Sequence, residues 1–127
     1  MRGASAIEDV LKRNPSDHLQ VLVVWEPILP MDWDPPNRWV RSRIVDPRVM
    51  QFWDKDHLVA KELARQLPAD TQLHCCRRSG VLWDIVALYS RDGRWGDAPL
   101  QFVDGPVVKA SERVEKRLHE TGGQAHF

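Results

Sequence analysis

The chain has only two cysteines, Cys75 and Cys76, and they are adjacent. Two cysteines cannot build the disulfide framework of a small secreted protein, so we expect a reducing, cytoplasmic compartment. The 18 basic and 18 acidic side chains leave no formal net charge. Because the protein has no net positive charge to attract nucleic acid or anionic lipid, neither is an expected partner.

The sequence also lacks long hydrophobic runs. The N-terminal segment 1–14 has no continuous apolar stretch of the kind found in secretory signals. The apolar runs elsewhere are far shorter than the roughly 20 residues that a membrane span requires, so no membrane partner is expected. The 127 residues are most simply one domain, 1–127, which is long enough to bury a core.

Hydrophobic periodicity predicts helices that alternate with buried strands. A helix at 5–14 precedes an apolar strand at 19–25, and the prolines within 26–36 make the next segment a rigid loop. Helices are expected at 37–45, 46–53 and 54–68, followed by a short strand at 72–76 and a buried strand at 81–89. Asp104-Gly105 predicts a hairpin turn. A last helix begins at Ser111, and 121–127 is a frayed tail.

This order predicts an α/β fold with a core at about 19–120. The expected architecture is one small mixed sheet with helices on both faces, completed by a C-terminal hairpin and helix.

Three local features carry a family resemblance. A strand ending in Trp25 precedes the loop "EPILPMD", Ala98-Pro99 opens the hairpin strand, and a terminal helix follows. This arrangement resembles the thioredoxin-like superfamily, in which a cis-proline opens the equivalent strand. The phrases "VVWEP" and "DPRV-x-QFWD" are similar to those of bacterial thioredoxin-like proteins of uncharacterised function that lack the Cys-x-x-Cys motif.

The resemblance implies where reactive cysteines would lie, and other residues stand there. The Cys-x-x-Cys motif follows the strand's Trp, and Leu29 and Asp32 occupy the corresponding positions. Leucine has nothing to ionise, and an aspartate cannot form a disulfide. The buried acid of the superfamily corresponds to Val23. Ordinary dithiol–disulfide oxidoreductase activity is therefore not expected at this loop.

Six tryptophans are many for a chain of this length. Four of them, Trp25, Trp39, Trp53 and Trp83, fall at strand ends and helix faces, as core residues do. In the thioredoxin-like arrangement the Trp25 exit and the Pro99 turn meet on one surface, and rigid aromatics there suit an extended peptide. Our first hypothesis is a non-catalytic domain that binds a peptide or protein through Trp25, Glu26, Leu29, Asp32, Trp33, Trp95 and Pro99.

The Cys75-Cys76 pair supports a second hypothesis, a redox or metal-handling protein. The following arginines would favour thiolates, and His74 extends the pair to a possible soft-metal ligand set. Consecutive strand residues point to alternating faces, however. The alternative is therefore that one cysteine is buried, the other lies at an edge, and neither has a function. The sequence has no phosphate loop, zinc-ligand spacing or dinucleotide-binding glycine pattern, and no cofactor is predicted.

The remaining acidic residues have structural and functional interpretations. Asp84 lies inside the apolar segment 81–89, where a carboxylate requires a hydrogen-bonding or ionic partner or a solvent-exposed edge of the sheet. A third hypothesis makes Asp84, with Glu26 and Asp32, an acid/base site. Asp46, Asp54 and Asp56 stand at predicted helix starts, so capping explains them more simply than a metal site with His57.

Overall fold

The computed structural model describes residues 2–15, 19–27, 34–68, 71, 73–78, 80–90, 94, 100–120 and 125–126, and it is an α/β structure. Its elements are, in order, α1 (Arg2–Arg13), β1 (Val21–Trp25), α2 (Arg38–Arg41), β2 (Val49–Trp53), α3 (Leu58–Gln66), the 3₁₀ turn η1 (His74–Cys76), β3 (Arg77–Arg78), β4 (Val81–Leu82), β5 (Val86–Ser90), β6 (Leu100–Asp104), α4 (Val107–Glu120) and β7 (Ala125–His126).

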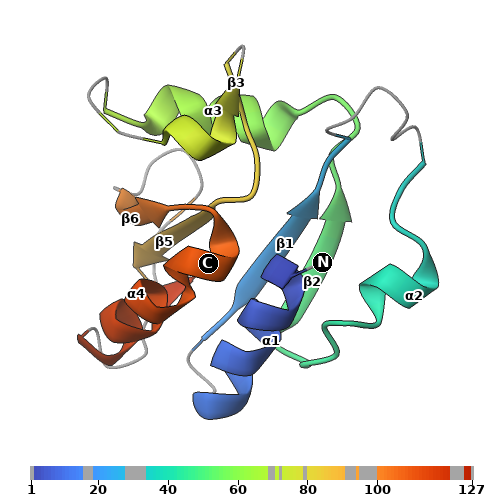
Figure 1. Ribbon diagram of the computed structural model, residues 1–127, viewed down its shortest axis with the longest axis vertical. Coiled ribbons are helices and arrows are strands. Elements are labelled where there is room, and N and C mark those ends of the chain that lie inside the picture. The colour runs from blue at the N-terminus through green and yellow to red at the C-terminus, as the bar shows by residue number, and fades with distance from the viewer. Residues whose placement is uncertain are drawn as a thin grey trace.

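The strands pair in small groups (Figure 1). β1 and β2 are parallel, in a register that runs from Val21 opposite Val49 to Trp25 opposite Trp53. β5 lies between β6 and β7 and is antiparallel to both, while β3 and β4 form an antiparallel hairpin. The sequence predicts one mixed sheet, whereas the strands of the described ranges form three separate sheets.

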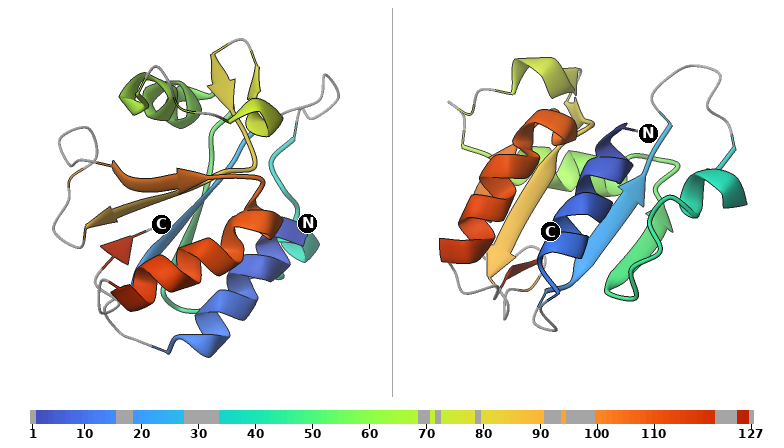
Figure 2. Two further views of the ribbon diagram at one scale, coloured as in Figure 1. Left: turned by 60° about the vertical axis from the view of Figure 1, so that its left-hand side comes forward. Right: turned by 60° about the horizontal axis from the view of Figure 1, so that its bottom comes forward.

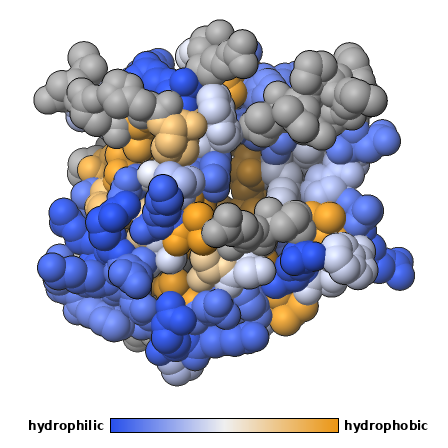
Figure 3. All heavy atoms as spheres, in the orientation of Figure 1, coloured by the Kyte–Doolittle hydropathy of each residue, from blue (hydrophilic) through white to orange (hydrophobic). Residues whose placement is uncertain are grey.

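Helices α1 and α4 pack side by side against one face of the strands (Figure 2). Their apolar residues, those of β1 and β5, and two residues outside the helices and strands (Leu19 and Ile44) make the first core. It comprises Ile7, Val10, Leu11, Leu19, Val21, Ile44, Val86, Leu88, Ala110, Val114 and Leu118. In Figure 3 hydrophilic side chains dominate the lower left of the visible surface, where α4 lies.

A second core lies on the opposite face of β5. It joins α3, β4 and β5 through Leu63, Leu73, Leu82 and Tyr89. Strand β5 is therefore covered on both faces. The loops that enter β5 and leave β6 are consequently held between well-packed elements.

The predicted helix at 46–53 is wrong, because Val49–Trp53 forms strand β2. Asp46 accepts hydrogen bonds from the backbone and guanidinium of Arg48 instead of capping a helix. The same guanidinium donates to the carbonyls of Leu11 and Asn14 at the end of α1. Asp54 is a helix cap, as predicted, since its carboxylate accepts from the first two amides of α3, each at 2.8 Å.

Three further expectations fail around the cysteines. Residues 74–76 form a 3₁₀ turn instead of a strand, and the strand predicted at 81–89 breaks at Asp84, whose φ is +51°. Asp104-Gly105 does not turn a hairpin. Pro106 instead leads directly into α4, because its carbonyl accepts the first helical hydrogen bonds, from Lys109 and Ala110. The last helix therefore begins at Val107, and the predicted start at Ser111 is wrong, since Ser111 lies within α4.

The ends of the chain and the tryptophans predicted to lie in the core also differ from the prediction. The N-terminal helix expected at 5–14 spans 2–13, and Ala125–His126 within the expected tail pair with β5. None of the four tryptophans expected in the core belongs to either core, because Trp25, Trp53 and Trp83 are only half-buried and Trp39 is exposed. Trp39 is 68% exposed and stacks beneath the guanidinium of Arg43 at 4.5 Å.

Tyr89 provides a test of the second core. Its hydroxyl donates to Gln66 at 2.8 Å, and burial, followed by the Glu62 carboxylate, raises its pKa from 10.0 to about 12. A raised pKa means that the folded state favours the protonated phenol. The resulting stabilisation is complete below pH 10.0 and is lost as the pH rises to about 12.

We therefore expect the free energy of unfolding to fall more steeply above about pH 10 in the wild type than in Tyr89→Phe. Urea unfolding of both proteins at about pH 8 and about pH 11 measures the difference. Equal losses in the two proteins would show that Tyr89 titrates as in the unfolded chain.

Candidate functional site

Cys75 and Cys76 are joined by a disulfide within the η1 turn. The Cys76 amide donates to the Leu73 carbonyl at 3.0 Å, and its carbonyl accepts from the Trp83 amide at 3.0 Å. Cys75 is exposed, whereas Cys76 is only 1% exposed. The pair therefore presents Cys75 to solvent and Cys76 to the interior.

The turn explains why the two sulfurs converge. Consecutive cysteines in a strand would lie on opposite faces, but this prediction is wrong because residues 74–76 are not extended. His74 belongs to the same turn, but its side chain lies outside the described part. Within that part, no three His, Cys, Asp or Glu residues are grouped so that they could hold a metal ion.

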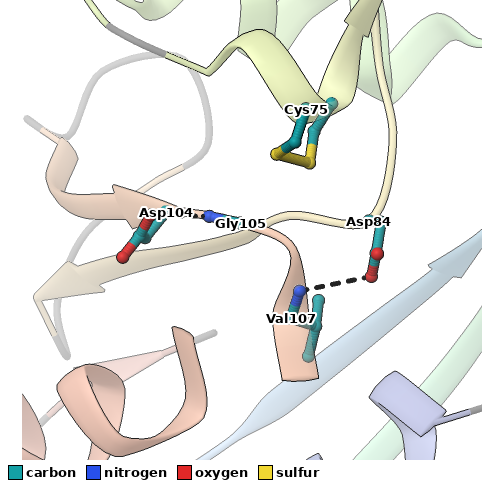
Figure 4. Close-up of a disulfide and its surroundings, with 6 residues drawn as sticks. Cys75, Asp84, Asp104, Gly105 and Val107 are labelled. Carbon is teal, nitrogen blue, oxygen red and sulfur yellow. Dashed lines mark hydrogen bonds between the residues drawn. A yellow bond between two sulfur atoms is a disulfide. The ribbon is translucent and has the colours of Figure 1, made fainter. Parts of the chain in front are cut away.

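Gly105 is the backbone neighbour of the disulfide (Figure 4). A Cβ atom there would lie 3.1 Å from Cys76 Sγ, 3.0 Å from Ile85 Cγ2 and only 2.7 Å from the Asp84 carbonyl oxygen. The Gly105-Pro106 peptide is cis. A proline turn thus lies beside the cysteine pair, although it is not the predicted Ala98-Pro99 turn, which falls outside the described residues.

Asp84 links this turn to α4. Its backbone oxygen and its Oδ1 accept from the Val107 amide at 3.1 and 3.2 Å, and the residue is exposed (Figure 4). A carboxylate at this position satisfies the first free amide of the helix and faces the positive end of its dipole. Asp84 is therefore a cap supplied by another segment, and the prediction that it lies within a buried strand is wrong.

Removing this cap should weaken α4. We expect Asp84→Ala to lower the free energy of unfolding by about 1–2 kcal/mol, because the side-chain acceptor is lost, only the backbone carbonyl remains for the Val107 amide, and alanine tolerates a positive φ poorly. Asp84→Asn keeps an acceptor and suits that backbone conformation, so it should retain most of the stability. Urea denaturation of the three proteins tests this, and equal losses in the two variants would refute the capping role.

Glu26 and His57 meet at the carboxyl end of the parallel strands. Glu26 Oε2 lies 3.0 Å from His57 Nδ1, and the amide of Asp54 donates to the Trp25 carbonyl at 2.7 Å. Burial raises the pKa of Glu26, while the hydrogen bond to His57 opposes this shift. His57 is not predicted from the sequence as a partner of Glu26, although both residues follow strands whose ends a parallel pair brings together.

The described contacts do not unite the predicted residues into one site. The Trp25 indole donates to Gln51 at 2.8 Å, Glu26 contacts His57, and Asp84 contacts α4. Five members of the predicted peptide surface, Leu29, Asp32, Trp33, Trp95 and Pro99, lie outside the described residues. Peptide binding through this surface therefore stays a prediction.

Comparison of the chain with protein-family models, curated proteins and solved structures gives no match. None of the helices in the described ranges is long and apolar enough to cross a membrane.

Proposed function

We propose that this protein exchanges thiols and disulfides through the Cys75–Cys76 pair. The observation that carries the proposal is the asymmetry of the pair, in which an exposed Cys75 is bonded to a buried Cys76. Exchange requires one sulfur that an external thiolate can reach and a second that can leave. The pair supplies both.

The proposed reaction takes two steps with a small-molecule thiol as reductant. Its thiolate attacks Cys75 Sγ, the sulfur–sulfur bond breaks, and Cys76 leaves as a thiolate that takes up a proton. A second thiol then attacks the small-molecule sulfur of the mixed disulfide and releases Cys75. Two external thiols become one disulfide, and the protein gains two electrons and two protons.

The scaffold supports a thioredoxin-like assignment within this proposal. Parallel β1 and β2, antiparallel β5 and β6, and a final helix α4 follow in the order expected for that fold. The reactive pair would lie in η1, far along the chain from the loop after β1 that carries cysteines in that superfamily. In a reducing cytoplasm, which we also propose, a disulfide is typically transient and serves catalysis or redox sensing.

A glutathione titration of the full chain tests the proposal. The protein is equilibrated with varied ratios of reduced and oxidised glutathione, free thiols are trapped by alkylation, and intact masses are measured. We expect Cys75 and Cys76 to change together in one two-electron transition. A pair that stays fully reduced or fully oxidised at every ratio would overturn the proposal. Peptide or protein binding through Trp25 and Glu26 is a separate prediction that this titration does not address.

A further inference from the structure

We propose that the reduced Cys75–Cys76 pair captures a trivalent arsenical between its two sulfurs. This inference rests on the proposed function, because the disulfide must first be reduced. Thiolates are soft ligands and bind soft, thiophilic centres in preference to hard ions. The inference specifies what the pair binds when its sulfurs are no longer bonded to each other.

The backbone of Cys76 keeps the two thiols together after reduction. Its amide is bonded to Leu73 and its carbonyl to Trp83, so both of its backbone polar groups are held. Cys75 is the preceding residue of the same turn. The sulfurs therefore stay near one another, and the second bond to a bound centre forms within one molecule at a high effective concentration.

Access to the pair is one-sided. Cys76 Sγ faces the backbone of Gly105, where even a Cβ atom would lie only 3.1 Å away. Cys75, whose sulfur is bonded to that of Cys76, is an exposed residue. An incoming centre thus reaches Cys75 first and then closes onto Cys76.

The number of available thiolates indicates which kind of metal or metalloid atom the pair can bind. A structural zinc site takes four ligands, whereas a trivalent arsenic atom that carries one organic group needs only two thiolates. Among the side chains that the structure describes, which do not include His74, no third His, Cys, Asp or Glu completes a metal-holding group with the pair. Sulfurs on adjacent residues also suit the bent geometry of trivalent arsenic.

The capture step involves no change of oxidation state. With phenylarsine oxide as the probe, two arsenic–sulfur bonds form and the arsenic–oxygen bond breaks. The protons of both thiols leave with the oxygen as one water molecule. The arsenic remains trivalent, and no oxidant or reductant is consumed.

The test uses the full chain, reduced and then freed of reductant. We expect one phenylarsine adduct per chain by native mass spectrometry, with both thiols protected from alkylation and no adduct on the oxidised protein. Cys75→Ser is the control, because Cys75 is exposed and its replacement leaves the buried residue in place. This variant should bind at least about 100-fold more weakly, since a single thiolate loses the intramolecular second bond.

Competition with thiols adds an independent readout. The wild-type adduct should resist excess monothiol and yield to a small dithiol, whereas the adduct of Cys75→Ser should yield to both. Equal affinity of the two proteins would overturn the inference. Failure of the proposed function is distinguishable, because the glutathione titration would then show no transition, whereas a pair that cycles normally but does not retain the probe refutes only arsenical capture.

Discussion

Gly105→Ala is expected to destabilise the folded protein by about 2–3 kcal/mol, as an overpacked interior does. The new Cβ would lie 2.7 Å from the Asp84 carbonyl oxygen, which is a backbone atom and cannot rotate away. It would also press on Cys76 Sγ at 3.1 Å. The β6–α4 junction must therefore shift, and with it the Val107 amide that Asp84 caps.

Gly80→Ala is the matched control for this substitution. A Cβ at Gly80 meets no heavy atom within 4 Å, but the residue has a φ of +76°. Its replacement should cost only about 1 kcal/mol, from backbone conformation alone. Urea unfolding compares the two variants with the wild type. A Gly105→Ala protein at least as stable as Gly80→Ala would show that the packing around the disulfide is looser than described.

Leu88→Ala is expected to cost about 3 kcal/mol, within the range for truncating a buried leucine. Leu88 is 1% exposed and lies in the first core, where β5 meets α1 and α4. Its removal leaves a cavity between two helices and a strand, and the opposite face of β5 is held by the second core. We expect little collapse around the cavity, so most of the cost remains.

Leu22→Ala provides the comparison, because Leu22 has the same side chain and also lies in a strand. It is 45% exposed on β1, so its truncation should change the free energy of unfolding by about 0.5 kcal/mol or less. Denaturant midpoints and slopes give both values. Similar losses at the two positions would contradict the placement of the first core.

The elements with strong periodicity could be predicted from the sequence. The apolar stripes of α1 and α3 and the continuous run of β1 are features of the chain itself, and the structure has those elements near the expected bounds. Strand β2 could not be recognised in this way. Asp46-Pro47 is typical of a helix start, and only the pairing of Val49 and its neighbours with β1 decides for a strand.

The geometry around the cysteine pair was even harder to predict from the sequence. The adjacent cysteines were recognisable as the only dithiol, but their convergence depends on a turn that no local pattern indicated. Asp104-Gly105 favours a hairpin by its composition, yet Pro106 pre-sets the first turn of α4 and the capping oxygens come from Asp84, about twenty residues earlier. Contacts between segments distant in sequence, such as Glu26 with His57, follow from the parallel strands and not from either segment alone.

The account depends most directly on a disulfide between Cys75 and Cys76 in the folded protein. Tryptic digestion after Arg65 and Arg77 releases both cysteines in the peptide 66–77. The folded protein is kept in air-equilibrated buffer, and its free thiols are alkylated before it is unfolded and digested. We predict an unalkylated peptide that is two hydrogen atoms lighter than its reduced form. A peptide alkylated at both cysteines, or one bridged to another chain, would contradict the account.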